Sequence, residues 1–313
     1  MVKPKFLESR IENEIRKTFS DSSIISYKKF NSGLVSPTYK VRIKNPQKIL
    51  VVKIYKAKNH LLAHTNENVS NYLFKMEFPV PQIYSSTLFK KQEIVVMKYI
   101  GGKNALSVYK NSSISKKRKI LKNLGILMRK LHVLKIPTQW IHHKHEVKNK
   151  KEWINWTKNR IKRYLSFAKE NLNLKHYLFL KKEFKNFLSL LRKDLEFVPL
   201  HWDYHLDNIL VDSQGNISGL FDFDNAMKGH SLADLGQARY WLRFSLKDFQ
   251  AFEYFLEGYG KSVRDKERTL IRGYCLLHLV AVTRSIWSKK RRLKWIIEEH
   301  KNILDELMEI KGT

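Results

Sequence analysis

The stretch "HWDYHLDNILVDSQGNISGLFDFD", residues 201–224, is the most informative part of this chain. It places four histidine or aspartate side chains in its first seven positions, continues with the apolar run "NILV", and ends on two more aspartates. The turn-forming "SQGN" between its two apolar runs predicts two short strands joined by a tight turn. Because a hairpin brings its two ends side by side, we expect Asn208 and Asp222 to converge on one point.

The residue types at this point suit phosphoryl transfer. Magnesium binds a few oxygen ligands from protein and completes its shell with phosphate oxygens and water, so a carboxamide and a carboxylate form a suitable pair. Asp203 precedes Asn208 by five positions and stays free to accept a proton from a hydroxyl nucleophile. We predict Asn208 and Asp222 as metal ligands and Asp203 as the catalytic base.

Three motifs in order carry a family resemblance: "H-x-D-x-x-x-x-N" at 201–208, "DFD" at 222–224 and "DLG" at 234–236. Together they resemble the aminoglycoside phosphotransferase and choline-kinase-like family, small-molecule kinases with the protein-kinase fold. The resemblance implies an α+β, bilobal fold with a small N-terminal antiparallel sheet lobe and a larger, mainly helical C-terminal lobe. It also implies ATP and Mg²⁺ as cofactors and a hydroxyl group of a small molecule as the acceptor.

The same resemblance assigns roles to the other polar residues of these motifs. His201 and Asp234 are expected to brace the catalytic loop. Asp224 is expected to reach the metal, to contact a substrate hydroxyl, or to make a structural hydrogen bond. The fold-level resemblance covers the whole chain, whereas the motifs cover only the nucleotide and catalytic sites.

The pattern of apolar residues agrees with two lobes. β-branched and aromatic runs predict strands at 26–30, 38–43, 49–56 and 93–100, with a helix over 63–76 that ends before two prolines. The pair Gly101 and Gly102 marks the boundary, so we divide the chain into 1–100, for nucleotide binding, and 101–313, for catalysis and acceptor binding. Apolar residues at helical spacing dominate the second part.

A kinase-like fold requires a lysine on its third strand and a helix glutamate that holds this lysine. "VVKIYK" supplies Lys53, and the helix that follows supplies Glu67. The alternative is that both are solvated charges.

The remaining nucleotide contacts are expected in two segments. The loop "NSGLVSPTYKV" would cover the phosphates through Gly33 and Ser36, although it lacks the G-x-G-x-x-G of protein kinases. In "VVMKYIGG", the base would contact Met97, Lys98 and Ile100.

The charge is unusual: 60 basic against 29 acidic residues give a net charge of +31. Such an excess suggests either an anionic partner or a compositional bias of the whole chain. Acidic residues nevertheless gather near the C-terminus, where the resemblance places the acceptor pocket. From this we predict an acidic acceptor site and an amino-bearing acceptor, such as an aminoglycoside-type or other antibiotic. The candidate residues are Glu253, Glu257, Glu298, Glu299, Asp305, Glu306 and Glu309.

Two other functions stay open. A serine/threonine protein kinase would share the fold, but only eleven residues separate Asp222 from Asp234, which leaves no room for a long activation loop. A non-catalytic basic binding protein is the second, although the complete set of motif residues argues against it. The tryptophans at 140, 153 and 156 lie among lysines, yet we do not expect nucleic acid as the main partner.

The histidine cluster, the single cysteine and the absence of an apolar targeting segment indicate where the protein works. The cluster "HHKH" at 142–145 has no accompanying cysteine and reads as a loop rather than a metal site. The single cysteine, Cys275, lies in an apolar run and is expected to be buried. One cysteine allows no disulfide within the chain, and neither a signal peptide nor a membrane-spanning run is evident. We therefore expect a cytoplasmic protein.

Overall fold

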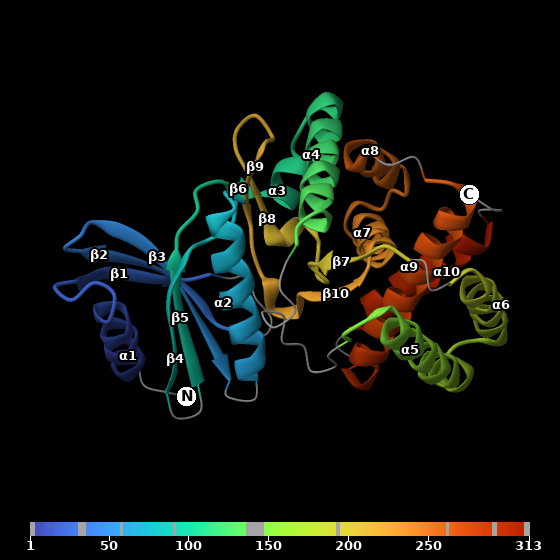
Figure 1. The fold of residues 1–313 in the computed structure, drawn as a ribbon, viewed down its shortest axis with the longest axis horizontal. Helices are drawn as coiled ribbons and strands as arrows, with labels where there is room; N and C mark the ends of the chain where they lie inside the picture. The colour runs from blue at the N-terminus through green and yellow to red at the C-terminus, as the bar shows by residue number, and fades with distance from the viewer. Residues whose placement is uncertain are drawn as a thin grey trace.

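A five-stranded antiparallel sheet forms the N-terminal part of the structure (Figure 1). Its strands are β1 (Ser23–Lys29), β2 (Thr38–Lys44), β3 (Lys48–Lys56), β4 (Ile83–Phe89) and β5 (Gln92–Lys98), in the order β1-β2-β3-β5-β4. Helix α1 (Pro4–Arg16) precedes the sheet, and α2 (His60–Lys75) connects β3 to β4. The computed structural model describes residues 4–30, 36–56, 59–89, 92–135, 147–191, 195–260, 263–289 and 293–309.

The two faces of the sheet pack against different helices, because successive side chains of a strand point to opposite faces. Val52 and Ile54 of β3 join Ile11 and Ile15 of α1 in one apolar cluster. Residues of β3 and β5 on the other face pack with α2 in a second cluster that includes Tyr55. By this alternation Lys53 belongs to the same face as Tyr55, the face that α2 covers.

The sequence predicts most of this sheet. The four predicted strands are all present with shifted ends, and the helix predicted at 63–76 is α2. Strand β4 was missed. It is an edge strand whose central residues Tyr84–Thr87 are all half-buried, so no apolar alternation marks it.

The predicted hairpin lies between the sheet and the helices. Strands β8 (Ile209–Val211) and β9 (Ile217–Leu220) form it, and the short β6 (Lys103–Asn104) pairs with β8. Before it come β7 (Phe197–Leu200) and the 3-10 turn η3 (Leu206–Asn208). After it come the 3-10 turn η4 (Phe223–Asn225) and β10 (Met227–His230), which pairs with β7. The catalytic loop, defined as residues 201–205, thus connects β7 to η3.

The rest of the chain is helical, and its buried faces form one large core. Asparagine or serine begins several of these helices: the side chains of Asn104, Ser113, Asn149 and Asn173 each accept a backbone N–H three residues on. None of the described helices combines the length and the apolar composition needed to cross a membrane. The helices are α3 (Ala105–Lys110), α4 (Ile114–His132), α5 (Lys150–Asn171), α6 (Leu174–Leu190), α7 (Ser231–Leu246), α8 (Gln250–Tyr259), α9 (Asp265–Ile286) and α10 (Lys294–Glu309). The 3-10 turn η5 (Trp287–Lys289) follows α9.

Helices α4 and α8 lie side by side (Figure 1), and glycines permit the close approach of their backbones. A Cβ atom built on Gly125 would lie 2.0 Å from the carbonyl oxygen of Phe255, and one built on Gly258 would lie 1.9 Å from that of Lys122. Backbone atoms cannot move aside as flexible side chains do. The contact therefore requires glycine at both positions.

We predict that Gly125→Ala destabilises the protein by about 1–3 kcal/mol, because the added methyl group forces the two helices apart. Gly101→Ala is the matched control, since no atom lies within 4 Å of a Cβ at that position. Equilibrium urea unfolding of both variants measures the difference. Equal stability of the two would contradict the close contact.

Candidate active site

Asp234 fixes the backbone of the catalytic loop. It lies in the first turn of α7, fully buried, and its carboxylate accepts the backbone N–H groups of His201 at 2.8 Å and Trp202 at 3.1 Å. His132 Nε2 lies 3.3 Å from the same carboxylate. Trp202 has a φ of 59°, a left-handed conformation that a bulky residue adopts only when its surroundings hold it there. Asp234 supplies that hold.

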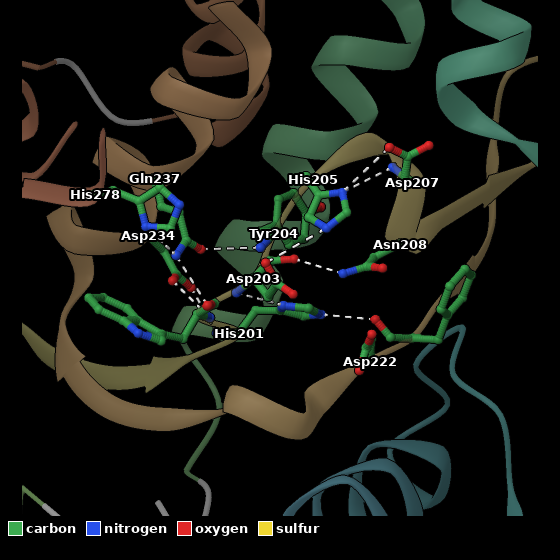
Figure 2. Close-up of polar contacts among 12 residues, drawn as sticks. His201, Asp203, Tyr204, His205, Asp207, Asn208, Asp222, Asp234, Gln237 and His278 are labelled. Carbon is green, nitrogen blue, oxygen red and sulfur yellow. Dashed lines mark hydrogen bonds and ion pairs between the residues drawn. The ribbon is translucent and has the colours of Figure 1, made fainter. Parts of the chain in front are cut away.

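His201 connects the catalytic loop to the end of the hairpin (Figure 2). Its Nδ1 accepts the N–H of Asp203 at 3.2 Å, so the ring proton lies on Nε2 and is donated to the carbonyl oxygen of Phe221, also at 3.2 Å. Burial lowers the pKa of His201 to about 4, and the ring is neutral at physiological pH. Its role is to position the backbone beside Asp203 and Asp222.

Asp203 lies at the centre of the site, between these supports and the hairpin (Figure 2). Asn208 donates its side-chain N–H to the carbonyl oxygen of Asp203 at 3.0 Å, which leaves the amide oxygen of Asn208 available to another ligand. Burial raises the pKa of the Asp203 carboxyl group. The nearby His205, whose Nε2 lies 3.7 Å from Asp203 Oδ1, lowers this pKa in part but does not cancel the effect of burial. A partly buried carboxylate in this position can accept a proton.

Lys53 joins the sheet to the hairpin. Its Nζ lies 2.9 Å from Asp222 Oδ1 and 2.9 Å from Asp224 Oδ2. Burial opposes the charge of Lys53, yet Tyr55 and the two carboxylates raise its pKa well above the usual value. Burial and the charge of Asp222 raise the pKa of Asp224 to about 7, and the Tyr55 hydroxyl donates to Asp224 at 2.7 Å. Asp222 itself has a φ of 72°.

The predicted pairing of Lys53 with Glu67 is not present in the structure. The Glu67 carboxylate lies 3.9 Å from His64 and bonds to Ser86, outside the Lys53 contacts. Successive helix residues point about 100° apart, so only one of the two neighbours can face the hairpin. That residue is Asn66, whose Oδ1 accepts the N–H of Phe223 at 3.1 Å.

The signal that would have identified Asn66 is the spacing of buried positions on α2. Asn66 shares its face with Ala63, Ser70 and Leu73, which lie three or four residues apart along the helix. An asparagine on an otherwise small and apolar face indicates a buried hydrogen bond.

The other residues predicted to contact the nucleotide differ in burial and in their backbone hydrogen bonds. Ser36 is buried just before β2, whereas Gly33 lies outside the described residues. Met97 is buried in β5. The backbone N–H of Lys98 already donates to the carbonyl oxygen of Gln82 at 2.8 Å. Lys98 and Ile100 were both predicted to contact the base through their backbone. Of these two N–H groups, only that of Ile100 has no backbone acceptor among the described residues.

The structure does not bring the predicted acidic acceptor residues to the catalytic loop. Glu299 and Glu306 of α10 both pair with Arg243, and Glu299 also pairs with Lys247 at 2.7 Å. Asp305 lies 3.1 Å from Lys175, and Glu298 lies 3.0 Å from Lys301. These four acids are therefore paired with basic residues, and Glu309 is exposed at the end of α10.

The acids predicted on α8 are paired as well. Glu253 bonds to Arg268 at 3.0 Å, and Glu257 lies 2.6 Å from Lys122. Asp224, which was also considered for the acceptor, faces Lys53 instead.

Gln237 is a site residue that the sequence analysis missed. Its Oε1 accepts the N–H of Tyr204 at 3.3 Å, and its Nε2 donates to the carbonyl oxygen of Trp202 at 3.1 Å. The same Nε2 lies 3.1 Å from Nδ1 of His278 on α9. Gln237 follows Asp234 by three positions, which places both on one face of α7. That spacing was a usable signal.

The residues at the hairpin fit a magnesium ion that is shared with phosphates. Asn208 and Asp222 supply oxygen ligands, and the backbone N–H of Phe221 donates to the carbonyl oxygen of Asn208 at 3.1 Å, which ties the two segments together. No group of three or more His, Cys, Asp or Glu side chains within the described ranges is arranged to hold a metal by itself. Magnesium is commonly bound in this way, through one or two protein ligands and substrate phosphates.

Comparison with known families agrees with this geometry. The model of the phosphotransferase enzyme family matches residues 26–270. The chain belongs to this family. It is therefore a kinase that uses an alcohol group as the acceptor. A comparison with curated proteins finds no match.

Solved structures of aminoglycoside phosphotransferases share the fold. The GDP complex of wild-type aminoglycoside 2'-phosphotransferase-IIIa is 15% identical, with a TM-score of 0.69 over 96% of this chain and 97% of that one. A thermostable mutant of APH(4)-Ia, in complex with ADP and hygromycin B, is 12% identical with a TM-score of 0.67 over 96% and 99%. The gentamicin complex of APH(2")-IIa is 16% identical with a TM-score of 0.60 over 97% of each chain. The bilobal, protein-kinase-like α+β fold is confirmed.

We predict that Asp234→Asn destabilises the phosphotransferase by about 1–3 kcal/mol, since the amide can accept only one of the two loop N–H groups and leaves the other buried and unpaired. Asp212→Asn is the control, because Asp212 also accepts two backbone N–H groups, from Gln214 and Asn216, but at an exposed turn. Urea unfolding should show a clearly smaller loss for the control. A larger loss at Asp212 would contradict the proposed hold on the loop.

Proposed function

We propose that this chain transfers the γ-phosphoryl group of ATP to a hydroxyl group of a small molecule. The observation that carries the proposal is the convergence of Asp203, Asn208, Asp222 and Lys53, which come from the catalytic loop, both ends of the hairpin and the third strand. Phosphoryl transfer requires positioning and charge stabilisation more than covalent catalysis, and these residue types supply both.

In this proposal Asp203 orients the acceptor hydroxyl and accepts its proton as the bond to phosphorus forms. The buried surroundings that raise the pKa of Asp203 make it a better base than an exposed aspartate. His201 and Asp234 keep its backbone in position through the bonds described above. Neither side chain contacts the reacting atoms.

Lys53 holds the phosphates of the nucleotide. Its two carboxylate partners keep it charged and extended. Asn208 and Asp222 hold Mg²⁺, which neutralises the charge of the phosphate oxygens when bound. We retain the division into a nucleotide-binding lobe, 1–100, and a catalytic lobe, 101–313, with Ser36, Met97 and Ile100 along the nucleotide. We also retain the cytoplasm as the expected location.

A protein acceptor is the second candidate, and the segment after the hairpin argues against it. Between Asp222 and Asp234 the chain forms only η4, β10 and the start of α7. No activation loop separates these elements, so the site lacks the segment through which regulated protein kinases bind a polypeptide.

We predict that Asp203→Asn lowers the rate of phosphoryl transfer by at least about a hundredfold, because the amide cannot accept a proton. The affinity for ATP should change little. Transfer of radiolabel from γ-labelled ATP and ATP binding measure the two quantities. Asp207→Asn is the control, being an exposed carboxylate of the same segment, and it should keep most of the activity. Near-normal turnover of Asp203→Asn would rule out the assigned base.

We further predict that Asp222→Asn weakens Mg²⁺-dependent ATP binding by at least about tenfold, since one of two protein ligands loses its charge. Glu67→Gln should leave this binding unchanged, because Glu67 does not contact Lys53. Calorimetric titration with ATP, with and without Mg²⁺, measures both variants. A large effect of Glu67→Gln together with none of Asp222→Asn would restore the pairing predicted from sequence.

A further inference from the structure

A guanidinium group lies over aromatic rings next to the catalytic loop. Arg160 of α5 lies 4.4 Å from the ring centre of Trp156 and 5.7 Å from that of Trp202, the residue before Asp203. Its Nε and Nη2 donate to the Tyr164 hydroxyl at 3.1 and 2.9 Å. The first of the three clustered tryptophans, Trp153, is fully buried in the core, so the aromatic surface beside the loop consists of Trp156 and Trp202.

Arg160 has no carboxylate partner among the described residues. This sets it apart from Arg243, Arg268 and Arg272, each of which pairs with a glutamate. Burial lowers the pKa of Arg160, and the neighbouring Arg163 adds to the effect. A largely buried positive charge without a counter-ion is costly unless a ligand supplies one.

Two buried hydrogen-bond donors lie near the same loop and also lack partners in the described part of the chain. The amide of Gln237 donates to Nδ1 of His278, so the ring proton of His278 is on Nε2, and this Nε2–H bonds to nothing. The indole N–H of Trp241 is likewise buried and unpaired. The two rings lie 5.6 Å apart, and Trp241 lies 4.8 Å from His205.

His278 lies on the side of Asp203 away from the proposed metal ligands (Figure 2), which is the side left for an acceptor in the proposed function. In Figure 2, His278 lies beyond Gln237, on the opposite side of Asp203 from Asn208 and Asp222. Burial lowers the pKa of His278 to about 3, with further contributions from Arg160 and His205. Arg160 lies over the ring of Trp202, whose carbonyl oxygen accepts from the same Gln237 amide that bonds to His278, so Arg160 lies beside the same region. This side presents one guanidinium and two N–H donors, and every acid predicted for it except Glu309 is paired with a basic residue.

We propose that Arg160, His278 and Trp241 form an acceptor subsite for an anionic group, so that the acceptor is a small hydroxylated compound that carries a carboxylate or phosphate. The inference rests on the proposed function. Arg160 pairs with the anionic oxygens, and the two N–H groups donate to oxygens of the same molecule. Because Arg160 already occupies the faces of Trp156 and Trp202, a cationic acceptor finds a positive charge there instead of a free ring.

The test compares molecules that differ in charge on one carbon skeleton. Two series serve: glycerate, glycerol and 3-amino-1,2-propanediol, and glucuronate, glucose and glucosamine. Binding to the full chain is followed by tryptophan fluorescence, with ADP and Mg²⁺ at saturation so that the nucleotide site is filled. We expect the anionic member of at least one series to bind at least about tenfold more tightly than its neutral and cationic partners.

Variants assign the preference to the subsite. Arg160→Gln should remove roughly tenfold of the affinity for the anionic probe while ADP binding stays intact. Arg163→Gln is the matched control, since Arg163 lies on the same helix, exposed, and carries the same charge. Trp241→Phe keeps the ring but removes the N–H donor, and should weaken the same probe. An equal effect of the two arginine variants would show a general charge effect and overturn the subsite.

The remaining outcomes separate this inference from the proposed function. If the anionic probes bind no more tightly than the neutral ones in either series, or if a cationic probe binds best, the inference is wrong even where label from ATP enters an acceptor. If the anionic preference depends on Arg160 but no probe and no other small alcohol receives the phosphoryl group, the subsite stands and the proposed function fails.

Discussion

The bonds from one lysine to two partly buried aspartates tie the two parts of this protein together. Lys53 comes from the third strand of the sheet. Asp222 and Asp224 follow the hairpin, 169 and 171 positions later in the chain. Two carboxylates this close, largely out of water, repel each other, and the ammonium group between them offsets that repulsion. In the proposed function the same contact places the cation that binds the phosphates beside one of the two proposed metal ligands.

A second constraint acts on the other side of Asp203. The catalytic loop contains a left-handed tryptophan, and the loop keeps this shape because Asp234 and Gln237, one turn apart on α7, bond to its backbone. The same helix face therefore supports the loop and, through Gln237, sets the proton position on His278. In the proposed function, the position of Asp203 and the subsite for the acceptor both depend on α7.

The net charge of +31 says less about the site than the charged groups that lie close to it. Near the C-terminus Glu299 and Glu306 pair with Arg243, and Asp305 pairs with Lys175, so the charge of these acids is already offset. Screening limits the reach of exposed charges to about 8–10 Å at physiological salt, and the field at the acceptor therefore comes from nearby groups. Around Asp203 those groups are Lys53, Asp222 and His205, together with Arg160 over the ring of the neighbouring Trp202.

The sequence by itself determined the fold, the family, and which residues converge at the hairpin. Fixed spacing within a short segment leaves few geometries, and Asp203, Asn208 and Asp222 lie within one loop and one hairpin. It could not determine which residue of a helix faces a distant segment. Glu67 and Asn66 are neighbours, and only the packing of α2 on η4 selects Asn66. Nor could it show that acids of α10 pair with Arg243 of α7 and Lys175 of α6, or that Arg160 of α5 lies over Trp202, since such contacts arise only when these segments pack together. The sequence shows how far apart the residues of one motif lie, whereas only tertiary packing decides which distant residue a long side chain contacts.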